Sequence, residues 1–112
     1  MDLVGHRFEH GGVAILALRG ELDLATVPRA RELLVRLITD HRGEVVVVDV
    51  RGVDFADSLG LGVLVGAQRR ARSQGGEVRV VVDGGQMAEA FALTGLDAVL
   101  PRFSAVEAAA AP

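Results

Sequence analysis

Hydrophobic residues in this chain fall into short runs separated by turn residues, and their spacing alternates between strand-like and helical patterns. Residues 3–9 and 13–19 are predicted to be two strands joined by a tight turn at His10-Gly11-Gly12. A helix is predicted from Thr26 to His41, because apolar residues recur there at helical spacing, namely Val27, Ala30, Leu33, Leu34, Leu37 and Ile38.

The middle of the chain carries the run Val45-Val46-Val47-Val48-Asp49-Val50, which is typical of a buried strand. A helix is predicted to follow from about Leu59 to Gln74. The later elements are expected to be a strand over Val78–Val82, a helix over Gln86–Thr94, a short strand over Leu96–Leu100 and a helix over Ser104–Ala111. Strands that alternate with helices after an opening hairpin predict one α/β domain with a mixed, mainly parallel sheet covered by helices. We expect residues 1–107 to form its ordered core and the alanine-rich residues 108–112 to fray.

Composition narrows the possible functions. The 112 residues carry a formal net charge of −3, and Arg69-Arg70-Arg72 is the main basic cluster, which argues against nucleic acid as a partner. Cysteine is absent, which excludes disulfides and thiolate metal sites. The sequence shows neither a leader peptide nor a long apolar run, so we expect a soluble, cytoplasmic protein without a membrane partner. Lysine is also absent, which removes phosphate-loop and Schiff-base chemistry.

Ser58 stands where the valine strand gives way to the following helix. Partners and ligands of α/β sheets dock at the carboxyl ends of strands, and a helix N-terminus tolerates a phosphate. A simple capping role for Ser58 is the alternative, although Asp57 is also able to cap the helix and leave Ser58 free. Gly60 and Gly62 weaken the first helical turn, so we interpret them as room for a partner's backbone or for a phosphate.

A second candidate site is the segment Gly20-Glu21-Leu22-Asp23-Leu24-Ala25-Thr26. It lies between the second strand and the first long helix, so we expect it at the same sheet edge as Ser58. Helix capping by Asp23 and Thr26, and a solvated charge at Glu21, remain open as simpler interpretations. An Asp23 that points toward Ser58 would hydrogen-bond its hydroxyl or repel a phosphate placed there.

Four segments resemble the STAS domains of bacterial anti-sigma factor antagonists. They are Gly20–Asp23 with Thr26, the valine strand, the block Phe55–Leu64, and Phe91–Leu96. The family's motif Asp-Ser-(Ser/Thr)-Gly-Leu, whose first serine is phosphorylated, matches Asp57-Ser58-Leu59-Gly60-Leu61. Leu59 stands where many members have a second hydroxyl, which leaves Ser58 as the acceptor.

The resemblance implies partner switching in transcription regulation, in a stress response or in sporulation. The unphosphorylated protein, free as a monomer, would bind an anti-sigma factor that is also a serine kinase of the histidine-kinase-like ATPase type, and so release the sigma factor. Phosphorylation of Ser58 would end the binding, and a metal-dependent serine phosphatase would reset the switch. The residues expected to contact the partner are Glu21, Asp23, Thr26, Asp57, Ser58, Leu59, Gly60 and Gly62.

Other functions fit the residues less well. A serine hydrolase needs Gly-x-Ser-x-Gly with a histidine base, but Ala56 replaces the first glycine and nothing marks a histidine as that base. No histidines have metal-ligand spacing, so we expect neither an enzyme nor a metal or cofactor site. The alternative is a phosphorylation-independent STAS adaptor, or a small-molecule or nucleotide-sensing module of a stress or transport complex. Residues 83–86 are the one further glycine-rich candidate for phosphate binding, and a strand-to-helix turn explains them more simply.

Overall fold

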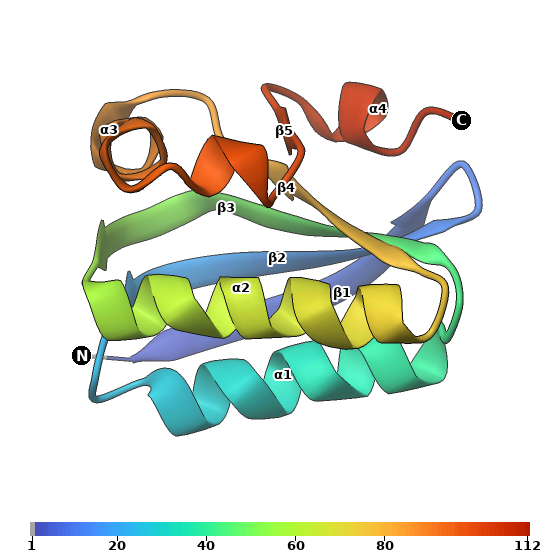
Figure 1. Ribbon diagram of the computed structural model, residues 1–112, viewed down its shortest axis with the longest axis horizontal. Helices are drawn as coiled ribbons and strands as arrows, with labels where there is room; N and C mark the ends of the chain where they lie inside the picture. Colours follow the sequence, from blue (N-terminus) through green and yellow to red (C-terminus); the bar gives the residue numbers. More distant parts are fainter. Residues whose placement is uncertain (1) are drawn as a thin grey trace.

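Five strands form one mixed sheet in the order β1-β2-β3-β4-β5 (Figure 1). The computed structural model describes residues 2–112. The hairpin of β1 and β2 is antiparallel, and the other neighbouring strands run parallel. The elements in chain order are β1 (Leu3–His10), β2 (Val13–Leu22), α1 (Val27–Asp40), β3 (Val45–Ala56), α2 (Ser58–Ser73), β4 (Glu77–Val81), α3 (Gly85–Thr94), the 3₁₀ helix η1 (Leu96–Ala98), β5 (Arg102–Phe103) and α4 (Val106–Ala109). This arrangement confirms the predicted α/β fold with an opening hairpin.

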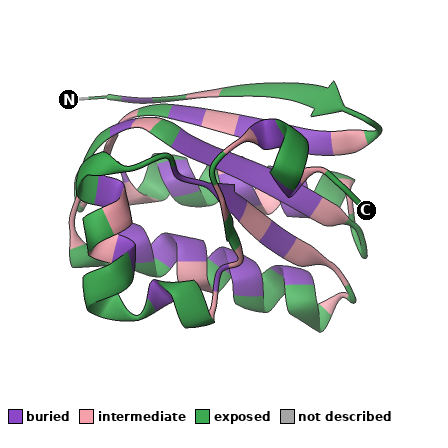
Figure 2. Cartoon of the chain, turned by 90° about the horizontal axis from the view of Figure 1, so that it is seen from above, coloured by how far each residue is buried: buried purple, intermediate pink, exposed green. Residues whose placement is uncertain are grey.

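The valines of β3 divide between two hydrophobic clusters because successive side chains of a strand point to opposite faces. Val46, Val48 and Val50 pack in the larger cluster with residues of α1, α2 and α3. Val47 packs on the opposite face in a smaller cluster that includes residues of α4. In Figure 2 the buried residues gather on the central strands and recur along the helices packed against them. The sheet is therefore covered by three helices on one face and in part by α4 on the other.

A buried glutamine ties α2 to the sheet. The Gln68 side-chain amide donates hydrogen bonds to the backbone carbonyls of Val78 at 2.9 Å and Val99 at 3.1 Å. Its carbonyl oxygen accepts the N–H of Val78 at 2.8 Å. Both the nitrogen and the oxygen of this buried side-chain amide are thus hydrogen-bonded, as is usual for buried polar groups.

Two strands are longer than predicted. β2 continues to Leu22, so Glu21 lies in a strand and not in a loop, and β3 continues to Ala56. Leu22 and Ala56 are register partners in the parallel pair of β2 and β3. Continued pairing between the two strands therefore carries both to the same edge of the sheet, where α1 and α2 begin (Figure 1).

The C-terminal segment departs from three predictions. A strand over Leu96–Leu100 is wrong: Leu100 donates its N–H to the carbonyl of Leu96 at 2.8 Å, and both side chains are buried on one side of a helical turn. The last helix is shorter than predicted and ends at Ala109. The tail is also not free, because Ala109 is fully buried and its carbonyl accepts a hydrogen bond from Arg79 at 3.0 Å.

Within residues 2–112, none of the helices combines the length and the apolar character needed to cross a bilayer.

Candidate functional site

Ser58 is the first residue of α2, and its side chain is exposed. The preceding Asp57 has an extended backbone, and its Oδ1 atom accepts the N–H of Gly60 at 2.8 Å. Asp57 is therefore the N-cap of α2, as the sequence allowed, and the simple capping role considered for Ser58 is wrong. The Ser58 hydroxyl forms no hydrogen bond to another of the residues from 2 to 112 and stays open to solvent.

Asp57 also joins the two loops at this edge of the sheet. Its Oδ2 atom accepts the N–H of Leu24 at 2.9 Å, and its own N–H donates to the carbonyl of Leu22 at 3.2 Å. The N–H groups of Gly60 and then Leu24 favour the charged carboxylate and hold the pKa of Asp57 below its ordinary value. One carboxylate thus fixes the β2–α1 loop against the start of α2, which confirms that the two candidate segments meet.

The two glycines of the first turn of α2 have different surroundings. A Cβ atom on Gly60 would lie 1.9 Å from the carbonyl oxygen of Leu22, so only glycine lets α2 begin this close to β2. Gly60 is buried, which corrects the interpretation that it leaves room for a partner. Gly62 is exposed, and a Cβ atom there would meet nothing within 4 Å.

Thr26 organises the β2–α1 loop from a buried position. Its hydroxyl donates to the carbonyl of Glu21 at 2.8 Å and accepts the N–H of Asp23 at 3.0 Å. The Asp23 carboxylate accepts the N–H of Thr26 at 3.2 Å, and no hydrogen bond links Asp23 to Ser58 in the described part of the chain. Because Thr26 is only 5% exposed, it shapes the loop and does not present its side chain to a partner, contrary to our expectation.

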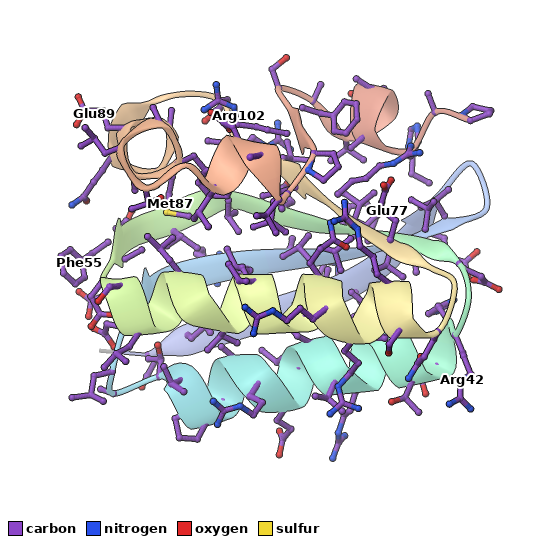
Figure 3. All side chains as sticks on the ribbon, in the orientation of Figure 1. Arg42, Phe55, Glu77, Met87, Glu89 and Arg102 are labelled. Carbon is purple, nitrogen blue, oxygen red and sulfur yellow. The ribbon has the colours of Figure 1, made fainter. Side chains whose placement is uncertain are left out.

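Exposed apolar side chains surround this edge. Leu24 is 67% exposed, Leu59 is 53% exposed and Phe55, labelled in Figure 3, is 40% exposed. Leu24 and Phe55 were not among the predicted contact residues. Phe55 lies near the end of β3 and is the register partner of Glu21, which only the strand pairing shows. We define the Ser58 surface as Glu21, Asp23, Leu24, Phe55, Asp57, Ser58 and Leu59. It combines an open hydroxyl and three carboxylates with exposed apolar side chains, and exposed apolar side chains that lie together mark candidate interaction sites.

Two other places are less suited to ligands. Gly84 and Gly85 line a hollow of about 370 Å³ before α3. Arg51 also lines it, but its guanidinium is already paired with Asp49, and the carboxylates of Asp54 and Asp83 in the same lining disfavour an anion. Residues 83–86 are therefore the expected strand-to-helix turn. Across residues 2–112, no group of three or more histidine, aspartate or glutamate side chains is arranged to hold a metal ion.

Comparison with known proteins gives a consistent family assignment. The family model for the STAS domain matches residues 8–109. The anti-sigma F factor antagonist of Paenibacillus polymyxa is 35% identical over 80 residues, which cover 71% of this chain and 68% of the relative. The anti-sigma-F factor antagonist RsfB of Mycobacterium tuberculosis is 31% identical over 96 residues, which cover 86% of this chain and 77% of the relative. The crystal structure of an anti-sigma factor antagonist from Mycobacterium paratuberculosis superposes with a TM-score of 0.85 at 26% identity and covers 96% of this chain and 90% of that one.

Proposed function

This chain belongs to the STAS domain family, and from that premise we propose that it is an anti-sigma factor antagonist controlled by phosphorylation of Ser58. The unphosphorylated form binds an anti-sigma factor through the Ser58 surface, and the bound anti-sigma factor no longer holds its sigma factor. The names of the relatives support the antagonist assignment. The observation that carries the role of Ser58 is its exposed hydroxyl beside an independent cap, Asp57.

The partner in this proposal is an anti-sigma factor that is also a serine kinase of the histidine-kinase-like ATPase type. The γ-phosphoryl group of its bound ATP passes to the Ser58 oxygen as the bond from the γ-phosphorus to the bridging oxygen breaks and ADP leaves, and a base of the kinase takes the hydroxyl proton. The acceptor is suited to this reaction because the hydroxyl has no partner to give up within residues 2–112. A metal-dependent serine phosphatase returns the protein to its binding form by hydrolysis.

Electrostatics explains why the modified protein would let go. A phosphate adds a charge of about −1.5 to −2 at pH 7. On the Ser58 surface it would stand among the carboxylates of Glu21, Asp23 and Asp57, in an interface that already has to desolvate them. The start of α2 tolerates the same charge because the positive end of the helix dipole lies there. The fold therefore persists while the complex dissociates.

The first test is the intact mass of the protein after incubation with ATP and each candidate anti-sigma kinase. We expect a gain of one phosphate that maps to Ser58 and disappears in the Ser58→Ala variant. Ser73→Ala is the matched control, because Ser73 is an exposed serine of the same helix that lies at its far end. A phosphate that maps to Ser73, or one that persists in Ser58→Ala, would contradict the proposal.

A binding assay with the same kinase separates the switch from simple adaptor function. Ser58→Ala should bind as the unmodified protein does, and Ser58→Asp should bind more weakly. Equal binding of both variants, with no phosphate gain from any kinase, would instead favour a phosphorylation-independent adaptor.

A further inference from the structure

A groove runs between α1 and α2, which lie side by side and begin at the same edge of the sheet (Figure 1). Its volume is about 270 Å³, and its floor is apolar. We call its buried apolar lining residues the floor; they are Leu34, Ile38, Val63 and Ala67. Leu59 lines the end nearest Ser58, so the groove is continuous with the Ser58 surface.

The α2 wall of the groove is open to close approach. Gly62 and Gly66 line it one helical turn apart, and a Cβ atom at either position would meet nothing within 4 Å. A partner's side chains can therefore reach the apolar floor without first displacing atoms of this chain.

The walls of the groove also carry positive charge. Arg31 of α1 and Arg70 of α2 line it, and within residues 2–112 neither forms an ion pair. Together α1 and α2 contain six arginines and two carboxylates, although the whole chain has a net charge of −3. Both carboxylates are already paired, Glu32 with Arg29 and Asp40 with Arg7. The groove is thus a basic, apolar strip on an acidic protein.

We propose that this groove binds an acidic amphipathic helix of a partner protein. Leucine-like side chains of such a helix fill the floor, and its carboxylates pair with Arg31 and Arg70. A membrane is a poorer fit, because the four floor residues are buried at the bottom of the groove and do not protrude. The inference goes beyond the proposed function, since it holds whether or not Ser58 is ever phosphorylated.

The test uses two designed helical peptides with the protein in its unmodified form. One has leucines at i, i+3, i+4 and i+7 with glutamates elsewhere, and its twin has lysines in place of the glutamates. We expect the acidic peptide to bind and to shift the backbone amide NMR signals of Gly62 and Gly66. The lysine twin should leave these signals unchanged.

Variants locate the binding. Both groove charges are reversed in the double variant Arg31→Glu with Arg70→Glu. Its affinity for the acidic peptide should fall by about tenfold or more, because two ion pairs are lost and two repulsions are added. Arg42→Glu is the control, because Arg42 is exposed and lies beyond the end of α1 in Figure 3. Gly66→Leu should block the groove while the protein stays folded, since the added Cβ atom has open space.

Three results of the peptide assay would overturn the proposal. They are equal binding of both peptides, amide shifts that lie away from the groove, and an Arg42→Glu effect as large as the double reversal. A fourth result would also overturn it: the protein binds vesicles of anionic lipid but not the acidic peptide. The occupant of the groove would then be a membrane surface and not a helix. None of these outcomes bears on Ser58, because no kinase and no phosphorylated protein enters the assay.

Discussion

Gly60 and Gly62 provide a sharp test of how α2 is seated, because they are two residues apart in the same turn and differ in their surroundings. The perturbation is the addition of one methyl group, as Gly60→Ala or Gly62→Ala. At Gly60 the new carbon would lie 1.9 Å from the carbonyl oxygen of Leu22 and 2.4 Å from its carbonyl carbon. At Gly62 it would meet no atom within 4 Å.

The expected free energies of unfolding move in opposite directions. Gly62→Ala should stabilise the protein by about 0.5–1 kcal/mol, because alanine loses less backbone entropy in a helix. Gly60→Ala gains at most a similar stability from the helix backbone. The clash of its new methyl group with Leu22 can be relieved only if the main chain of β2 or of α2 moves. Overpacking of this kind costs about 1–3 kcal/mol, so the net effect is a loss of stability. The two variants should differ by roughly 1–4 kcal/mol, which is the overpacking cost plus any part of the helix gain that Gly60→Ala does not realise.

Urea unfolding followed by far-UV circular dichroism measures this difference, and it suits a chain without tryptophan or tyrosine. The transition midpoint of Gly60→Ala should fall below that of the unmodified protein, and that of Gly62→Ala should rise above it. A Gly60→Ala protein at least as stable as Gly62→Ala would refute the claim that glycine is required by the approach of α2 to Leu22.

Three further predictions follow from polar contacts and from the C-terminal helix. Gln68→Leu should lower the free energy of unfolding, measured in urea, by about 1–3 kcal/mol, because it leaves the buried N–H of Val78 without its acceptor; an unchanged midpoint would show that another group replaces it. The pKa of Asp57 is lowered in the folded protein, so the stability that this carboxylate contributes is present at neutral pH and is lost as the pH falls below about 3.9 toward the folded value. An NMR titration of its carboxyl signal checks this, and a midpoint at or above that of a free aspartate would contradict it. Deletion of residues 105–112 should lower stability by about 2–4 kcal/mol, because it removes the buried Val106 and Ala109 from the smaller cluster; a deletion variant with an unchanged midpoint would mean that α4 contributes no packing energy.

The fold was predictable wherever hydrophobic spacing dictates an element. The run of valines in β3 and the apolar face of α1 specify a buried strand and a helix that covers it. The segment Leu96–Leu100 was predicted wrongly because five residues with apolar ends satisfy a short strand and a helical turn equally well. The turn hydrogen bonds distinguish the two, including those from Val99 and Leu100 to the carbonyl of Leu96, and they depend on where α3 and β5 place the ends of the segment.

The candidate site was predictable in its location but not in the roles of its residues. The sequence placed Ser58 and Asp23 at one sheet edge, and the structure brings their segments together through Asp57. The burial of Gly60 and Thr26 depends on the close approach of α2 and the β2–α1 loop to the chain's own backbone, and that approach cannot be obtained from spacing along the chain. For the same reason, the exposure of Leu24 was visible only once the loop was folded.

The division of roles between Asp57 and Ser58 has a consequence for any modification of the serine. Had Ser58 been the cap of α2, a phosphate on its oxygen would have competed with the hydrogen bond that starts the helix. Instead, Asp57 accepts the N–H of Gly60 and holds Leu24 with its second oxygen, so the helix start and the adjoining loop are fixed without the serine. Chemistry at the Ser58 oxygen can therefore change the charge of the surface while the hydrogen bonds beneath it stay intact. An exposed serine beside a separate capping residue thus allows binding to be switched without a change of fold.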